Sequence, residues 1–373
     1  MDTQNVVDTV IEQFEDLVDF DSQGMIDYYV DESWDQLRQN ERRQGGFRER
    51  HRREWGDALD LLGRIHFLSM EVGRRFNGKC RDNEANGPTP ELFDALTRLH
   101  GRMCLVSSEI KTLLESGHAS GAQARWRTLY ETLAIMLFIA QDGNETAERY
   151  LLHELITSAE AVDEYSKYRE KLGLEPLEEK ARKELKEDYE NLKSKYEGVF
   201  ATNYGWAAEA LEERGIDHGG RPRLHQIAEV VGLDHLRPYY RLSNYSIHAG
   251  AKAIKFNLGL VEETDRILSG PSNYGLADPA SCTALALEHS LLPLLFYGVS
   301  RVSKGNEVSE TLISETLEVA FAVKSIWKLS DQCQEEFHRV QEDIEKREKR
   351  LREKESRMWE KLDDLDFELP SSL

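Results

Sequence analysis

The feature that most constrains the fold is a stretch of 55 residues, from Val308 to Leu362, that contains neither glycine nor proline. Glycine and proline interrupt helices more strongly than other residues, so their absence predicts one very long helix or two nearly continuous ones. Apolar residues also recur at three- and four-residue intervals along most of the remaining chain, and no run alternates apolar and polar residues between turn signals. The sequence therefore predicts an all-α protein.

Turn-forming residues divide the rest of the chain into further helices. Gly45 and Gly46 predict a break within the N-terminal helical region. The segment from Gly250 to Ala280 is rich in glycine and proline and is expected to be irregular, either as a plain connection or as a lid. We expect helices over Thr3–Phe20, Ser22–Arg43, Phe47–Phe76, Glu91–Glu115, Ala122–Gln141, Glu145–Leu172, Leu177–Leu211 and Pro279–Arg301.

The clearest linker is RDNEANGPTP, from Arg81 to Pro90. It combines the residue types that favour turns and is followed by a strongly helical pattern, which indicates a domain boundary. We expect an N-terminal helical arm with a basic patch (residues 1–82), a central helical bundle (90–305) and a long C-terminal helix with an acidic tail (306–373).

The C-terminal helix carries an apolar residue at every seventh position of its second half. This spacing forms only half of a coiled-coil seam, because most of the companion positions are basic. We expect the helix to mediate self-association, most simply as a homodimer, or to bind a protein partner. The residues of this series are Phe337, Ile344, Leu351, Met358 and Leu365.

Charge is unevenly distributed along the chain. The net charge of −21 argues against a surface that binds nucleic acid everywhere, because phosphate binding relies on Lys and Arg. From Leu37 to Arg81, however, 12 Lys and Arg face 6 Asp and Glu. This basic patch is either a solvated helix face or a contact for RNA. Its densest part holds the candidate RNA-binding residues Arg42, Arg43, Arg48, Arg50, Arg52 and Arg53.

Several features favour a cytoplasmic protein that needs no cofactor. The four cysteines form no C-x-x-C pair, so neither a zinc site nor a disulfide framework is expected. The N-terminus is acidic and amphipathic rather than signal-like, and the longest apolar runs are about half the length that spans a bilayer. The motifs of P-loop, dinucleotide-binding and α/β-hydrolase enzymes are missing from the sequence, so we expect no cofactor, no metal and no membrane span.

The segment from Leu236 to Gly250 holds the strongest candidate for chemistry. On a continuous helix Arg241 and His248 would share one face, roughly 10 Å apart along the axis, with Asn244 between them. A guanidinium that grips phosphate and an imidazole that titrates near neutral pH are the parts that metal-free phosphodiester cleavage requires. The other reading is that these are satisfied polar residues at the end of a helix.

A second candidate is the pair formed by Arg127 and Glu131, one turn apart on a helix that then becomes wholly apolar. An unpaired carboxylate is costly to bury, so an ion pair between the two is the simplest expectation. Alternatively, Glu131 reaches across the bundle to Arg241 or His248, where it would fix the guanidinium or raise the pKa of the imidazole.

Two segments carry a resemblance to a known family. RTLYETL (Arg127 to Leu133) and YRLSNYSIHAG (Tyr240 to Gly250) resemble a bacterial helical family catalogued only as domain of unknown function 5677. The resemblance covers roughly Glu91 to Arg301. That family is similar in turn to HEPN-type helical proteins, in which an Arg and a His a few residues apart form a metal-independent ribonuclease site, commonly completed by dimerisation. Arg241 and His248 match the two motif positions.

The resemblance implies a HEPN-like central bundle and a function. The first hypothesis is a metal-independent endoribonuclease of a bacterial stress or antiphage defence system, with RNA as its partner. The alternative is a non-catalytic binding or scaffolding protein that recruits partners through its terminal helices. In the first hypothesis Arg241 and His248 are catalytic and are supported by Arg127, Glu131, Tyr240 and Asn244.

Overall fold

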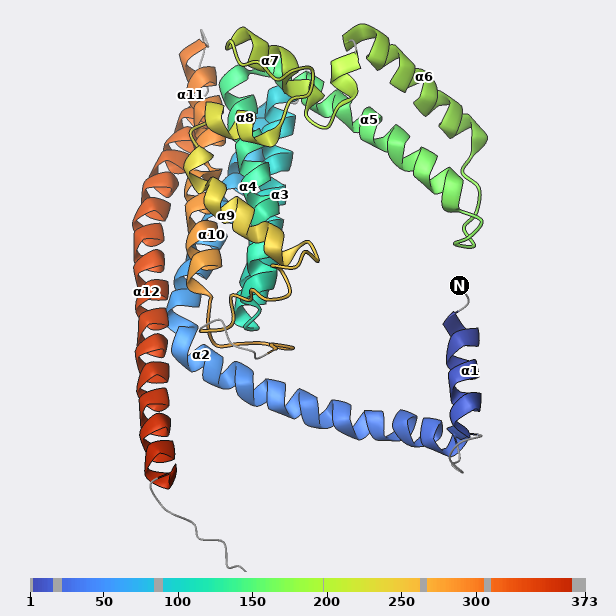
Figure 1. Ribbon diagram of the computed structural model, residues 1–373. Helices are drawn as coiled ribbons and strands as arrows, with labels where there is room; N and C mark the ends of the chain where they lie inside the picture. The colour runs from blue at the N-terminus through green and yellow to red at the C-terminus, as the bar shows by residue number, and fades with distance from the viewer. Residues whose placement is uncertain are drawn as a thin grey trace, which may run out of the picture. The chain divides into compact units, whose positions relative to one another are not determined.

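The computed structural model describes residues 3–15, 22–83, 90–196, 198–261, 267–304 and 310–363. These residues form helices and no strand, so the all-α prediction is confirmed (Figure 1). Part of the expected linker (84–89), the coiled-coil position Leu365 and most of the acidic tail (364–373) lie outside them.

The described part of the chain contains twelve α-helices and four short 3-10 helices. The α-helices are α1 Thr3–Glu15, α2 Ser22–Asn83, α3 Glu91–Glu115, α4 Ala119–Asp142, α5 Asn144–Tyr168, α6 Glu179–Tyr196, α7 Ala208–Glu213, α8 Leu224–Val230, α9 Arg237–Ser243, α10 Ala277–Ser290, α11 Leu292–Lys304 and α12 Glu310–Asp363. The 3-10 helices are η1 Gly198–Ala201, η2 Gly205–Ala207, η3 Asp234–Leu236 and η4 Asn244–Ser246.

The chain divides into two compact units, Met1–Glu54 and Trp55–Leu373. The first unit contains α1 and the N-terminal part of α2. None of its described side chains before His51 is buried, so this part of the chain has no hydrophobic core of its own.

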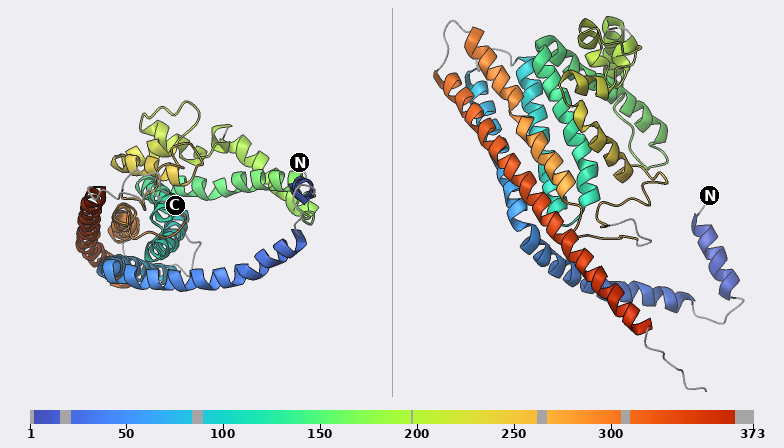
Figure 2. Two further views of the ribbon diagram at one scale, coloured as in Figure 1. Left: turned by 60° about the horizontal axis from the view of Figure 1, so that its bottom comes forward. Right: turned by 60° about the vertical axis from the view of Figure 1, so that its left-hand side comes forward.

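The core of the second unit is built around α4. Every residue of α4 from Leu133 to Ile139 is buried, because α3, α10 and the short helices α8 and α9 pack around it. A helix that is apolar on all sides belongs at the centre of a bundle. α12 lies against α10 and α11 on the outside of this bundle (Figure 2).

The C-terminal part of α2 runs antiparallel to α12. The rings of Trp55 and Phe337 lie 5.5 Å apart, and Arg75 forms an ion pair of 2.5 Å with Glu318. The pairing joins the beginning of the second unit to its last helix. It also places Phe337 and Ile344, two positions of the heptad series, in the core.

The expected break at Gly45 and Gly46 is wrong. α2 continues through both glycines from Ser22 to Asn83. A glycine inside a helix costs only about 1 kcal/mol relative to alanine, and the neighbouring Gln, Arg and Glu residues are good helix formers. Two glycines therefore weaken the helix without ending it.

Two predicted helices are each interrupted. The expected helix from Leu177 to Leu211 is α6 followed by η1, η2 and α7. The chain turns at Gly205, where a Cβ atom would lie 2.2 Å from the backbone oxygen of Val199, so only glycine fits. The expected helix from Pro279 to Arg301 is α10 and α11, since Pro293 has no N–H to donate within a continuous helix.

One described stretch, Ala277–Ser303, is long and apolar enough to cross a membrane by composition alone. It comprises α10 and most of α11, and 61% of its most apolar window is buried inside the bundle. Such burial also accounts for its composition, because core helices pass the same test.

His100 of α3 provides a test of the core. It is buried against Gly73 of α2 and lies 3.2 Å from the Ser69 hydroxyl, and burial lowers its pKa from 6.5 to about 4. The folded chain therefore binds fewer protons than the unfolded chain between these values. We predict that His100 by itself lowers the free energy of unfolding by roughly 3 kcal/mol as the pH drops from 6.5 to 4.

Chemical denaturation across this pH range, compared between the wild type and His100→Asn, measures the contribution of this histidine. The variant should be less stable at pH 7 and should lose less stability on acidification. Equal pH slopes for the two chains would contradict the assignment.

Candidate functional site

The candidate site is built on α9, which packs on the N-terminal half of α4. The amide of Gln123 donates to the Ser243 hydroxyl at 3.0 Å and to the backbone oxygen of Tyr239 at 3.3 Å. Both Gln123 and Ser243 are fully buried. A buried amide that bonds to two groups of α9 fixes this helix against α4, because breaking the contact would leave polar atoms without partners.

The prediction of one continuous helix from Arg241 to His248 is wrong. α9 ends at Ser243, η4 follows over Asn244–Ser246, and the chain then leaves helical geometry. His248 nevertheless remains connected to this turn, since its backbone N–H donates to the backbone oxygen of Asn244 at 3.0 Å.

Three of the predicted site residues lie together. The guanidinium of Arg127, on α4, donates to the side-chain oxygen of Asn244 at 2.6 Å and lies 4.6 Å from the ring centre of Tyr240. A hydrogen bond and a cation–π contact hold a planar guanidinium in one orientation. Arg127 thereby connects α4 to the turn that carries Asn244.

Glu131 has none of its three expected partners within the described residues. Its carboxylate accepts a hydrogen bond of 2.6 Å from the hydroxyl of Tyr204, and within the described chain it forms no ion pair with Arg127 and no bond with Arg241 or His248. Burial, and the nearby carboxylate of Glu131, raise the pKa of Tyr204 well above its ordinary value. The phenol therefore stays protonated and acts as the donor.

Tyr204 was not anticipated from the sequence. It lies in the segment between η1 and η2, 73 residues after Glu131 along the chain. The only local signal is its position before Gly205 and Trp206, where a tight turn carries aromatic residues into the core.

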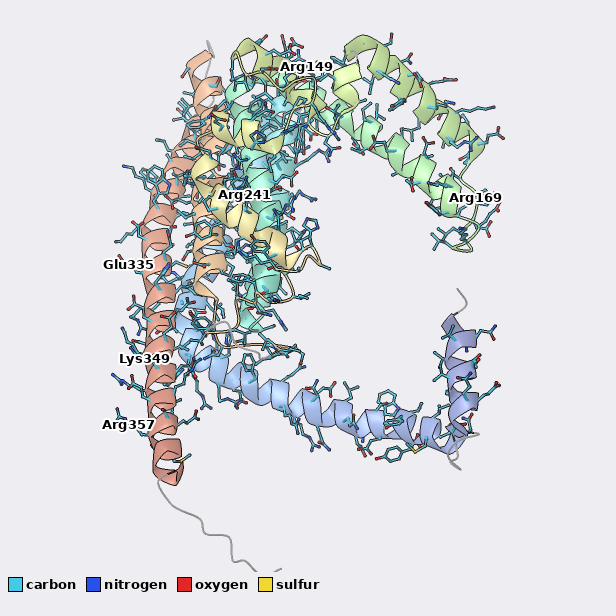
Figure 3. All side chains as sticks on the ribbon, in the orientation of Figure 1. Arg149, Arg169, Arg241, Glu335, Lys349 and Arg357 are labelled. Atoms are coloured by element: carbon cyan, nitrogen blue, oxygen red, sulfur yellow. The ribbon has the colours of Figure 1, made fainter. Side chains whose placement is uncertain are left out.

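Arg241 and His248 both have exposed side chains. Within the described part of the chain, neither side chain forms a hydrogen bond or an ion pair. Figure 3 shows Arg241 on α9. The two groups proposed for catalysis are thus open to solvent, whereas Arg127 and Asn244 hold each other in place through their hydrogen bond.

The surroundings of the site are basic and aromatic. From His235 to Val261 the sequence has four Lys and Arg and no Asp or Glu, in a chain whose net charge is −21. The amine of Lys252 lies 4.7 Å from the ring centre of Tyr245, which in turn contacts Phe256 edge to face. This segment can attract an anion and offers aromatic faces beside it.

The six candidate RNA-binding arginines of the basic patch belong to the first unit. All of them, Arg42, Arg43, Arg48, Arg50, Arg52 and Arg53, are exposed along α2. Arg53 lies 3.9 Å from Glu49, a contact within one helix turn. Their role in RNA binding stays a prediction.

The described residues show no group of three His, Cys, Asp or Glu side chains that could hold a metal ion. All four cysteines are buried, and none of them forms a disulfide.

Comparison with known proteins places this site within a family match. Residues 93–266 match the model of a family of unknown function (DUF5677), over just under half of the chain. The matched region contains Arg127, Tyr204 and His248, and it supports the resemblance to that family. No curated protein and no solved structure matches the chain.

The bond between Tyr204 and Glu131 can be tested through stability. We predict that Tyr204→Phe lowers the free energy of unfolding by about 1–2 kcal/mol, because a half-buried carboxylate loses its donor. Tyr165→Phe is the matched control, since the Tyr165 hydroxyl donates to the Glu175 backbone at an exposed position. Denaturant unfolding measures both variants. Equal losses of unfolding free energy would show that the bond to Glu131 stabilises the fold no more than the exposed bond of Tyr165 does.

Proposed function

We propose that this chain is a metal-independent endoribonuclease of the HEPN type, acting in a bacterial stress or antiphage defence system. Arg241 and His248 are its catalytic residues. The proposal is supported by one observation above all: two exposed side chains with the required chemistry lie within four residues along the chain of Asn244, whose side chain is held by Arg127.

The proposed reaction is an attack by a ribose 2′-oxygen on the adjacent phosphorus. His248 accepts the proton of the 2′-hydroxyl, the bond from phosphorus to the 5′-oxygen breaks, and water protonates the leaving oxygen. The products are a 2′,3′-cyclic phosphate and a 5′-hydroxyl. Arg241 stabilises the charge that develops on the non-bridging oxygens.

The remaining predicted residues have positioning roles in this proposal. Arg127 holds Asn244 through their 2.6 Å hydrogen bond and rests on Tyr240. The amide group of Asn244 can then donate to a phosphate oxygen while its own oxygen is engaged. The role of Glu131 is indirect, because its carboxylate binds the Tyr204 hydroxyl and neither of the two catalytic side chains.

We predict that His248→Ala reduces RNA cleavage by about 100-fold or more, the range typical for loss of a general base. Arg241→Ala should cause a loss of similar order, since transition-state charge is left without its cation. Cleavage of total bacterial RNA by purified protein in excess chelator measures both effects.

Matched controls are an exposed histidine and an exposed arginine that have no role in the proposed reaction. His235 and Arg182 are exposed. His235→Ala and Arg182→Ala should leave the cleavage rate within about twofold of the wild type. Equal cleavage by wild type and His248→Ala, with both chains folded, would remove the proposal.

A second candidate function is a non-catalytic scaffold that acts through α12. It is favoured by Leu351 and Met358, which continue the heptad series of the core but are about half exposed. The measurement is antiphage protection in host cells. A scaffold function predicts that the double variant Leu351→Glu, Met358→Glu abolishes protection. His248→Ala would then leave protection unchanged, whereas the ribonuclease predicts its loss.

A further inference from the structure

The N-terminal part of α2 exposes seven large apolar side chains. None of the described residues from Ser22 to Arg50 is buried. A helix gains most of its stability from packing, and large apolar side chains left exposed along it indicate an interface. The exposed apolar residues are Met25, Ile26, Tyr28, Tyr29, Val30, Trp34 and Leu37.

Three of these residues, Ile26, Val30 and Leu37, share a heptad spacing with four further positions of α2. Starting at Ile26, the positions that follow are spaced alternately by four and three residues and lie on one stripe, which we call the arm seam. The ends of the seam are apolar and its middle is largely polar. The arm seam consists of Ile26, Val30, Ser33, Leu37, Asn40, Gln44 and Phe47.

The charges along the same segment divide into two halves. Residues 1–37 contain no Lys or Arg, whereas residues 38–53 contain seven Arg and two Glu. RNA would be attracted to the second half and repelled by the first. A second copy of the helix in antiparallel orientation matches both halves, because each acidic half then lies beside a basic half.

We propose that the chain forms a homodimer through antiparallel pairing of the N-terminal part of α2 along the arm seam. The interface has twofold symmetry, with Val30 opposite the partner's Phe47 and Leu37 opposite the partner's Asn40. The proposal stands on the arm alone and does not depend on the ribonuclease activity.

Edge residues select this register. Asp27 and Arg48 each directly follow a seam position, so both lie on the same edge of the seam. In a twofold antiparallel pair this edge lies beside the same edge of the partner. Asp27 therefore pairs with the partner's Arg48. A shift by one heptad in one direction would place Asp27 beside the partner's Glu41. A shift in the other direction would place Arg43, on the opposite edge of the seam, beside the partner's Arg43. Both shifts bring like charges together and are repulsive.

Charge reversal of the full-length chain tests the proposal by sedimentation velocity. Asp27→Arg and Arg48→Asp should each raise the dimer dissociation constant about tenfold or more, because two ion pairs become two like-charge contacts. An equimolar mixture of the two variants should dimerise as well as the wild type, since every contact is again between opposite charges. Glu179→Arg, at an exposed position of α6, is the matched control and should change nothing.

Restored dimerisation in the mixture also shows that both variant chains are folded. A monomeric wild type would overturn the proposal, and so would a dimer that neither variant weakens or that mixing does not restore. If Arg48→Asp weakens RNA binding but leaves the dimer intact, the basic half of the arm is an RNA contact and the proposal is wrong.

Discussion

The enclosed position of α4 is the constraint on which the rest of the second unit depends. Its segment from Leu133 to Ile139 is buried on all sides, and each large apolar side chain there contributes about 1.5–3 kcal/mol through burial. A helix held this firmly also fixes its own N-terminal half. Gln123 and Arg127 lie in that half and bind α9 and the turn after it.

Two residues of the site are held in place and two others are exposed to solvent. Arg127 and Asn244 form a hydrogen-bonded pair, while Arg241 and His248 project into solvent within about one helix turn of Asn244 in sequence. Metal-free cleavage of RNA requires a cation and a base that can reach the backbone, together with a fixed group that orients the phosphate. The described geometry has both kinds of group within one short segment.

Local patterns predicted most of the fold. The bounds of α3 are those expected, because Pro90 precedes a clean amphipathic pattern and Gly117 follows it. The predictions failed where a local signal was weaker than its surroundings. At Gly45 and Gly46 the helix formers on both sides outweigh the glycines, and at Pro293 a continuous apolar pattern concealed a break between two helices.

The candidate site was only partly predictable. The sequence singled out Arg127, Tyr240 and Asn244, but their contact depends on α9 packing against α4, which no local pattern specifies. Glu131 was expected to pair with a cation and instead binds Tyr204. Its partner is a neutral phenol from a distant segment, and charge patterns in the sequence carry no signal for such a bond.

The central claim concerns the chemistry of Arg241 and His248, and the ends of the RNA products report on that chemistry directly. Mass spectrometry of RNA fragments generated in excess chelator should find 2′,3′-cyclic phosphates and 5′-hydroxyls, the products of attack by the 2′-oxygen. Fragments with 3′-hydroxyl and 5′-phosphate ends, or intact RNA, would contradict the assignment of these two residues.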